Sequence, residues 1–422
     1  MDNATHAFAG LLLADATSAW VARRTGVADT PRRRRAIALL GVVAAELPDA
    51  DLLYSGPVVG MGKLGYLLHH RGHTHTIVFA VVAALLLWWM TLWFRRRPDG
   101  AADARERLPL LVLALAGTLS HILLDFTNVY GVHPFWPLDN RWIYGDAVFI
   151  VEPWLWVVAI PPLLFGVRAR WNRALLGALL CVIVGLSWTA GQMSSALAAW
   201  VTVGAAVSLA AFRLLPASRR VAVGIATWCV VEAVFSLSSA RAASVVRSTL
   251  RDDERVLDIV LSPGAANAGC FDLLLVTLDG GDYRVRAGAV APWRRGQAAD
   301  DSASCRTRGR GVRFAGYPGT HPVARSADAR LAWHDEWRAP VAELRALNAS
   351  RCEFAAALRF LRVPVWRTRP DGGVELSDAR FGVGGGGFSD LRIATGACPL
   401  PARAWIPPWT PPRTDALGNA GP

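Results

Sequence analysis

Lysine is almost absent from this chain of 422 residues. Lys63 is the single lysine, although lysine and arginine together number 45, so the net charge of +12 rests on arginine. Charged residues of either sign are also scarce, at 18% against 53% hydrophobic residues. Soluble domains usually carry about 25% charged residues, and this balance therefore indicates a membrane protein. Eighteen tryptophans agree with it, because indole rings favour the membrane–water interface.

The arginines do not form a basic face of the kind that nucleic-acid-binding proteins use. They cluster at the ends of apolar runs, as in Arg32–Arg35 and Arg95–Arg97. Since basic residues in short loops stay in the cytoplasm, we interpret these clusters as topology signals and expect no nucleic acid as a partner. Genomic base composition is an alternative reason for the choice of arginine over lysine.

About eight apolar runs have the roughly 20 residues that a bilayer crossing needs. They are 4–22, 36–54, 76–94, 108–125, 147–167, 174–191, 194–215 and 220–239. The loops that we place in the cytoplasm are Arg23–Arg35, Arg95–Arg107, Arg168–Arg173 and Arg213–Arg220. They alternate correctly with eight spans and put both termini on the outer face. The first run contains His6 and Asp15 and follows no basic segment, so we expect it to be retained rather than cleaved.

The character of the chain changes after residue 240, where no further span-length apolar run occurs. Alternating segments such as CFDLLLVTLDGGDYRVRAGAV predict strands joined by hairpin turns, and DEWRAPVAELRALNASRCEFAAALRFL predicts helix. The sequence therefore predicts a mainly α-helical polytopic membrane protein with a C-terminal soluble α+β domain. The predicted units are 1–150 with the polar site, 151–240 with additional spans, and 241–422 with an extended or disordered tail.

Six cysteines divide between these parts. Cys181 and Cys229 lie within predicted spans, where packing is the simplest role. The other four, in the domain placed outside, are Cys270, Cys305, Cys352 and Cys398. Four cysteines allow two disulfides in any of three pairings, and none forms a CxxC pair that would favour a zinc knuckle. Disulfides would fit an oxidising compartment.

Acidic and imidazole side chains gather in the most apolar half of the chain, where seven of the nine histidines precede residue 134. His121 and Asp125 stand four apart, which places them on one helix face, able to share a metal ion. Asp49 and Asp51 follow Pro48, which should end a helix, and two carboxylates in apolar surroundings repel unless a cation lies between them. The alternatives are a helix-packing histidine and carboxylates that cap a helix end.

The stretch LLHHRGHTHT contains four histidines, His69, His70, His73 and His75. Imidazole and carboxylate ligands together suit zinc or a similar transition metal. Arg71 in the same stretch could hold an anionic oxygen bidentately. The alternative is a histidine-rich loop at the headgroup level of the membrane.

These motifs, in the order TH, PDxD, HRGxTH and HxxxD, resemble the YdjM-like family of membrane-bound, metal-dependent hydrolases. That family looks distantly similar to zinc-dependent phospholipase C and the S1/P1 nucleases, which use clustered zinc ions on phosphoesters. The resemblance covers roughly residues 1–150 and implies a bacterial inner membrane protein. The metal ligands that it implies are His6, Asp49, His70, His75, His121 and Asp125. Asp51 and Arg71 match the motifs as well, whereas His73 and His69 fall outside the matched positions.

The predicted function is hydrolysis of a lipid or lipid-linked phosphoester at the extracytoplasmic face. Zinc would activate water, Asp49 or Asp51 could act as general base, and Arg71 would steady a phosphate-like transition state. The chain has no HExxH or GxSxG motif, and its glycine run lacks the lysine of a P-loop. A metal-ion or proton transporter is one alternative. The other is a non-catalytic membrane anchor for the C-terminal domain, in which metal acts as a structural staple.

Overall fold

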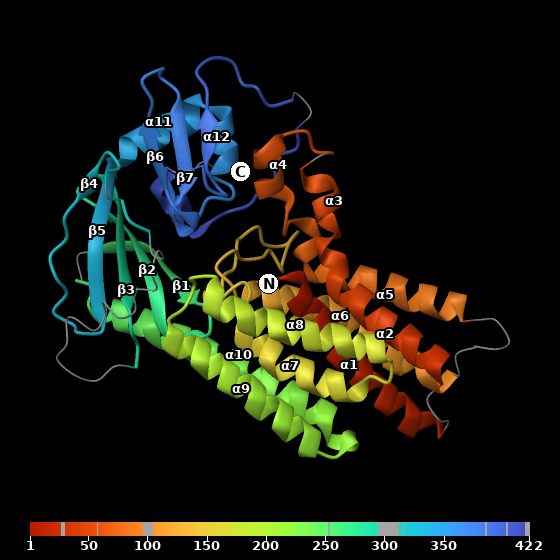
Figure 1. The fold of residues 1–422 in the computed structure, drawn as a ribbon. Helices are drawn as coiled ribbons and strands as arrows, with labels where there is room; N and C mark the ends of the chain where they lie inside the picture. The colour runs from red at the N-terminus through yellow and green to blue at the C-terminus, as the bar shows by residue number, and fades with distance from the viewer. Residues whose placement is uncertain are drawn as a thin grey trace.

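The computed structural model describes residues 1–26, 30–56, 58–95, 104–251, 254–293, 312–314, 316–384, 386–401 and 404–417. Figure 1 shows a helical part, from α1 to α10, and a C-terminal part built on antiparallel sheets. The N-terminus lies where the two parts meet (Figure 1).

The helical part contains ten α-helices and three short 3₁₀ helices among the described residues. In chain order they are α1 (Asn3–Thr25), α2 (Pro31–Glu46), η1 (Leu47–Asp51), α3 (Leu52–Ser55), α4 (Gly62–His69), η2 (His73–His75), α5 (Ile77–Phe94), η3 (Ala104–Glu106), α6 (Arg107–Phe126), α7 (Pro153–Gly166), α8 (Arg170–Thr189), α9 (Ser195–Leu214) and α10 (Ala217–Arg247). Each apolar run predicted from the sequence contains a helix, but in the run 147–167 the helix α7 begins only at Pro153, and residues 147–152 are not helical.

Within the described part of the chain, five helical segments are long and apolar enough to cross a membrane: Ile77–Phe94, Ala104–Phe126, Arg170–Thr189, Ser195–Leu214 and Ala217–Arg247. The helix α7 is apolar but has only 14 residues. The predicted run 36–54 is not one straight helix, because Pro48 follows the end of α2 and the chain continues as the 3₁₀ helix η1. This turn, which proline favours at a helix start, brings Asp49 and Asp51 close together.

Small residues let the helices around the site approach closely. A Cβ atom added at Gly10 would lie 2.5 Å from the carbonyl oxygen of Gly41, so α1 and α2 touch backbone to backbone. The buried residues of α5 are Ala80, Ala83 and Ala84, whereas large apolar side chains such as Leu86 and Trp93 are exposed. Small residues at helix contacts and large apolar residues outside are typical of helices in a bilayer.

Among its described residues, the C-terminal part has two sheets and two α-helices. The first sheet has the order β1-β2-β3-β5-β4, formed by β1 (Arg255–Gly264), β2 (Asn267–Asp279), β3 (Asp282–Val290), β4 (Thr320–His321) and β5 (Leu331–Pro340). The helices α11 (Val341–Ser350) and α12 (Cys352–Ala357) precede the second sheet, β6 (Pro364–Thr368), β7 (Val374–Asp378) and β8 (Leu391–Ile393). Gly280 and Gly281, both at positive φ, form the predicted hairpin turn between β2 and β3. The antiparallel strands with α11 and α12 confirm the predicted α+β character.

The cysteines at the described positions of this part are disulfide-bonded. Cys352 is bonded to Cys398, and Cys270 is disulfide-bonded as well. Cys305 lies outside the described residues. Cys181 and Cys229, predicted as packing residues, instead have exposed positions on α8 and α10.

The C-terminal part packs directly on the helical part. One hydrophobic core joins Leu64, Leu67 and Leu68 of α4 to residues of both sheets. Arg362 joins the parts by ion pairs to Asp146, at 2.8 Å, and to Asp258, at 2.6 Å. The tail predicted as extended or disordered has no regular helix or strand from 404 to 411, but it is packed in the core, where Trp409 is fully buried. The 3₁₀ helix η6 (Pro412–Leu417) follows. Residues 418–422 of that tail lie outside the described residues.

Candidate metal centre

The polar residues singled out in the sequence meet at one end of the helical part. His6 lies in the first turns of α1, Asp49 and Asp51 lie in η1, and His121 and Asp125 lie in the last turns of α6. The segment from the end of α4 to η2 supplies His70, Arg71 and His75. These residues are buried except Asp49, which is partly buried with 11% of its side chain exposed.

Four of these side chains converge on one point. One ligand atom each from Asp49, His75, His121 and Asp125 lies within 4.8 Å of all the others. The Nε2 atoms of the two histidines are 3.1 Å apart. His75 Nε2 lies 3.4 Å from Asp49 Oδ1 and 3.0 Å from Asp125 Oδ2, and His121 Nε2 lies 3.5 Å from each of the same two oxygens.

These spacings fit a tetrahedral metal ion. Zinc binds imidazole nitrogen and carboxylate oxygen at about 2.0–2.2 Å, so the edges of its ligand tetrahedron are about 3.3–3.5 Å long. Asp49 Oδ1 and Asp125 Oδ2 are buried, and apart from the Nε2 atoms of the two histidines no described residue offers them a hydrogen bond. Buried carboxylate oxygens are costly without a partner. The four atoms therefore have the spacing of a tetrahedral ligand set, and a divalent cation between them would neutralise the two carboxylates.

The outer nitrogens of the two histidines support the same assignment. His121 Nδ1 lies 2.5 Å from the carbonyl oxygen of Ala45, so Nδ1 carries the proton and Nε2 offers its lone pair. His75 Nδ1 lies 3.0 Å from Thr74 Oγ1 and 3.4 Å from Asp51 Oδ2. Hydrogen bonds of this kind orient metal-binding histidines and select the tautomer.

A second group shares Asp49 with the first. Ligand atoms of Asp49, Asp51 and His70 lie within 4.8 Å of one another, and His70 Nδ1 lies 2.9 Å from Asp51 Oδ1. The other oxygen of Asp51 accepts hydrogen bonds from the Arg71 N–H and the Thr74 hydroxyl, each at 2.8 Å. Asp51 thus ties the His70–His75 segment to η1, which leaves Asp49 as the more available carboxylate.

His6 borders the four-atom group. Its ring stacks on His121, with centroids 3.8 Å apart, and its Nε2 atom lies 3.3 Å from Asp125 Oδ1. Neither ring nitrogen of His6 has a hydrogen-bond partner among the described residues. The α-amino group of Met1 contacts the same Asp125 oxygen. His6 is therefore placed to add a ligand on the α1 side of the group.

The electrostatics of the cluster favour a positive charge at its centre. Burial opposes protonation of His75, but the carboxylates of Asp125, Asp49 and Asp51 outweigh burial and raise the pKa of His75 to about 10. Opposite charges within a few ångströms stabilise the charged form in this way. In the metal-free protein a proton on His75 compensates carboxylates that a cation would otherwise neutralise.

Arg71 lies beside the cluster in an uncommon backbone conformation, with φ of 58°. Its guanidinium NH2 lies 2.9 Å from Asp125 Oδ1, and NH1 donates to Asn128 Oδ1 at 3.0 Å. The guanidinium carbon lies 4.7 Å above the ring of Tyr130. Its Nε–H has no acceptor among the described residues, so Arg71 retains donor capacity for an anionic oxygen.

Several contributors were not singled out in the sequence. Asn3 donates to Asp49 Oδ2 at 3.3 Å, and Asn128 and Tyr130 surround Arg71. His133 directs Nδ1 to the carbonyl oxygen of Arg71 at 3.1 Å, and burial lowers its pKa well below the usual imidazole range, so the ring is neutral. These residues lie at no motif spacing, and for His133 the sole signal was its position as the seventh histidine of the apolar half.

His69 and His73, which fall outside the matched motif positions, lie against aromatic rings and not among the candidate metal ligands. His69 lies 5.6 Å from Trp405, and His73 lies 4.6 Å from both Trp136 and Trp405, measured between ring centroids.

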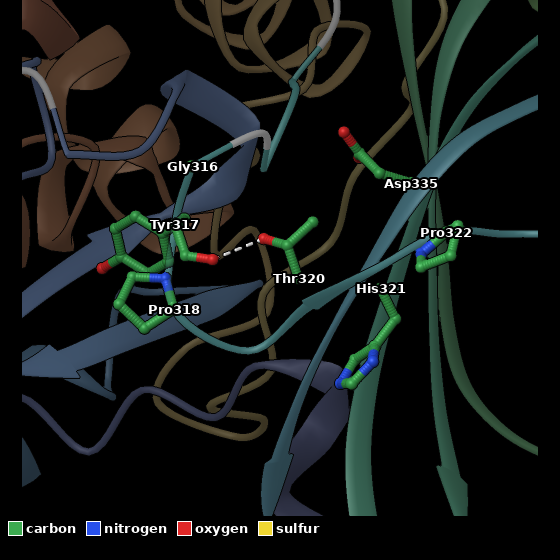
Figure 2. A pocket seen from close by; sticks show the side chains of 7 residues that line it. All are labelled: Gly316, Tyr317, Pro318, Thr320, His321, Pro322 and Asp335. Carbon is green, nitrogen blue, oxygen red and sulfur yellow. Dashed lines mark hydrogen bonds between the residues drawn. The ribbon is translucent and has the colours of Figure 1, made fainter.

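A separate hollow of about 530 Å³ lies on the C-terminal part beside β4 and β5 (Figure 2). Thr320 donates there to the carbonyl oxygen of Tyr317 at 2.6 Å, and His321 is exposed at its edge. None of the metal-centre residues lines this hollow, so we assign it no role in the site.

Comparison with known proteins supports the family resemblance. Residues 1–196 match the model of the family described as YdjM inner membrane protein. A curated relative, inner membrane protein YbcI of Escherichia coli (strain K12), is 34% identical over 157 residues, which cover 32% of this chain and 82% of that protein. No solved structure matches, and no match links the chain to phospholipase C or the S1/P1 nucleases. The matched segment contains every residue of the candidate metal centre, and the chain belongs to the YdjM inner membrane protein family.

Proposed function

We propose that this protein is a membrane-bound, metal-dependent hydrolase that acts on a lipid or lipid-linked phosphoester. The observation that carries the proposal is the convergence of Asp49, His75, His121 and Asp125, in which the carboxylate oxygens Asp49 Oδ1 and Asp125 Oδ2 have no described neighbour to donate to them other than the two histidines. Mixed imidazole and carboxylate ligands suit zinc. The second group, formed by Asp49, Asp51 and His70, could hold a further ion with Asp49 shared between the two.

A divalent cation held there supplies Lewis acidity toward a phosphoryl oxygen and makes water more acidic. The chain itself supplies the remaining functions. Asp49, the most exposed carboxylate of the group, is placed to accept a proton from water if it is not a ligand. Arg71 retains an unused Nε–H donor and is placed to hold an anionic oxygen of the substrate.

The surroundings of Asp49 favour a lipid substrate. Directly after η1, Leu52 and Leu53 are 41% and 77% exposed. An amphiphile approaching along these leucines would bring its polar group to the least buried carboxylate of the centre. Exposed apolar residues beside a polar site are typical of surfaces that receive apolar ligands.

We further propose eight spans, with α1, α2 and α7 added to the five long apolar helices. Arg23 and Arg24 end α1, and arginines also follow α7 and α9. Placing these basic ends in the cytoplasm puts the metal centre and the C-terminal part on the extracytoplasmic side.

The first test measures bound metal in purified wild type, His75→Ala and His121→Ala, with His321→Ala as a control on the distant β4 strand. We expect wild type and His321→Ala to carry a divalent transition metal and the other two variants to lose it. A wild type without bound metal would refute the proposal. Hydrolysis of phospholipids and lipid pyrophosphates is then measured with the metal-loaded proteins. Bound metal without hydrolysis of any of these lipids would favour a non-catalytic membrane anchor in which the metal is structural.

Transport of a metal ion or proton is the second candidate, and Glu232 favours it. Glu232 lies within α10, and neither of its carboxylate oxygens has a hydrogen-bond partner among the described residues. Ionisable residues inside membrane spans often mark ion pathways. Uptake of metal or protons into proteoliposomes, abolished by Glu232→Gln while lipid hydrolysis is absent, would support transport instead of hydrolysis.

A further inference from the structure

The C-terminal part reaches the metal centre through Trp409. This residue is fully buried, its indole N–H donates to the carbonyl oxygen of Leu68 at 2.8 Å, and its ring stacks on His133 with centroids 3.8 Å apart. Trp409 lies far beyond residue 196, where the family match ends. A side chain from outside the shared segment therefore contacts the loop that carries the site.

His133 connects Trp409 with Arg71. The ring of His133 lies between Trp409 and Trp142, whose centroid is 3.7 Å away on a tilted ring. Since a carbonyl oxygen only accepts hydrogen bonds, the Nδ1 atom of His133 donates to the Arg71 carbonyl at 3.1 Å. The two tryptophans thus fix the direction of a hydrogen bond to the Arg71 backbone.

Arg71 needs this support because of its positive φ of 58°. Such a conformation is uncommon outside glycine and persists where the surroundings hold it. Two hydrogen bonds hold it here, from the Arg71 N–H to Asp51 Oδ2 and from His133 to the Arg71 carbonyl. With the backbone set in this way, the guanidinium lies 2.9 Å from Asp125 Oδ1.

The C-terminal part also holds the loop that carries His133. Arg380, which is buried and paired with Asp378, donates to the carbonyl oxygen of Val129 at 2.8 Å. The ring of Tyr130 lies 5.1 Å from that of Phe360. The segment from Asn128 to His133 therefore has partners from the C-terminal part on several sides.

We propose that the C-terminal part is a positioning element of the metal centre, which acts through Trp409 and His133 to hold Arg71 where it binds an anionic oxygen. His133 and Trp409 are positioning residues, since neither contributes an atom to the four-atom group that could hold the metal ion. The anion-binding role of Arg71 rests on the proposed function, whereas the mechanical link from Trp409 to Arg71 does not.

The test contrasts two substitutions of His133 in the full-length protein. His133→Phe keeps a ring between the tryptophans but removes the donor, and His133→Asn offers an amide N–H close to the position of Nδ1. Loss of one hydrogen bond changes a local opening equilibrium about fivefold. We expect amide hydrogen exchange of the 68–75 segment to rise about fivefold in His133→Phe and to return toward wild type in His133→Asn.

Trp409→Phe tests the contribution of the C-terminal part, with Trp366→Phe as its matched control. Trp366 is also buried and donates its indole N–H, to Glu343 Oε1 at 3.0 Å, but lies in the core of the C-terminal part. We expect faster exchange of the 68–75 segment in Trp409→Phe and no change there in Trp366→Phe. Equal exchange in His133→Phe, Trp409→Phe and wild type would overturn the proposal.

Binding of Co²⁺ and of inorganic phosphate to the Co²⁺-loaded protein separates this proposal from the proposed function. We expect the Co²⁺ stoichiometry to be unchanged in all four variants and phosphate affinity to fall about fivefold in His133→Phe and Trp409→Phe. Unchanged phosphate affinity in both variants, with phosphate bound by wild type, would overturn the link to anion binding. If wild type binds Co²⁺ but no phosphate, the anion role of Arg71 in the proposed function fails, and the exchange measurements alone decide whether His133 and Trp409 position Arg71.

Discussion

Metal binding to this centre should depend steeply on pH, because His75 must lose a proton before its Nε2 atom can bind a cation. The neighbouring carboxylates overcome the effect of burial and raise the pKa of His75 to about 10, against about 6.5 for an ordinary imidazole. Below pH 10 the metal-free site therefore holds a proton that competes with metal. Apparent affinity should increase about tenfold for each pH unit, so that binding at pH 7 is weaker than at pH 10 by about 4 kcal/mol.

The assay is Co²⁺ titration of metal-free protein in detergent at pH 6.5, 7.5 and 8.5, with calorimetry in buffers of different ionisation enthalpy to count released protons. We expect about one proton released per ion and an affinity gain of about a hundredfold across this range. An unperturbed histidine would instead give a nearly constant affinity above pH 7. His321→Ala, on the distant β4 strand, should keep the wild-type slope. Constant affinity with no proton release would refute the electrostatic reasoning.

Three further predictions concern the fold. Gly41→Ala should lower the thermal stability of the detergent-solubilised protein, since the added Cβ would lie 2.5 Å from the Gly10 carbonyl oxygen. The control Gly185→Ala meets no atom within 4 Å and should be neutral or slightly stabilising. Equal losses of stability in the two variants would argue against the close contact of α1 and α2. Arg362→Ala should cost about 3–5 kcal/mol in unfolding experiments, because it leaves two carboxylates without their cation, and a loss below about 1 kcal/mol would contradict this. Cys398→Ser removes a disulfide that closes a 46-residue separation and should destabilise the C-terminal part by about 2–4 kcal/mol, measured by limited proteolysis. The reduced wild type, which also loses the disulfide of Cys270, should be at least as sensitive, and a variant as resistant as the oxidised wild type would contradict this.

Much of the helical part was predictable because its signals are local. The apolar run that becomes α5 begins immediately after Thr76, whose hydroxyl accepts the N–H of Phe79 and caps the helix. Pro48 likewise marks the end of α2. The run 4–22 shows the limit of such reasoning, since α1 forms there but its composition does not reach that of the five long apolar helices.

The metal centre was predictable to the extent that motif order and charge alternation indicated which segments meet. Spacing paired His121 with Asp125, and the resemblance to the YdjM-like family singled out His75 and Asp49 as ligands; the structure brings ligand atoms of all four together. Spacing could not separate Asp51 from Asp49, because both belong to one turn. Their difference comes from the hydrogen bonds that the His70–His75 segment donates to Asp51.

The sequence by itself determined where helices form and which polar side chains sit in apolar surroundings, because hydrophobic runs, prolines and caps act over a few residues. Only the tertiary structure decided that Trp409, more than 270 residues from His133, stacks on it and thereby contacts the Arg71 loop. It also decided that a tail of prolines and tryptophans packs against the site. Such contacts depend on the complementary shapes of two surfaces formed by segments that are far apart in the sequence, so no local sequence pattern predicts them.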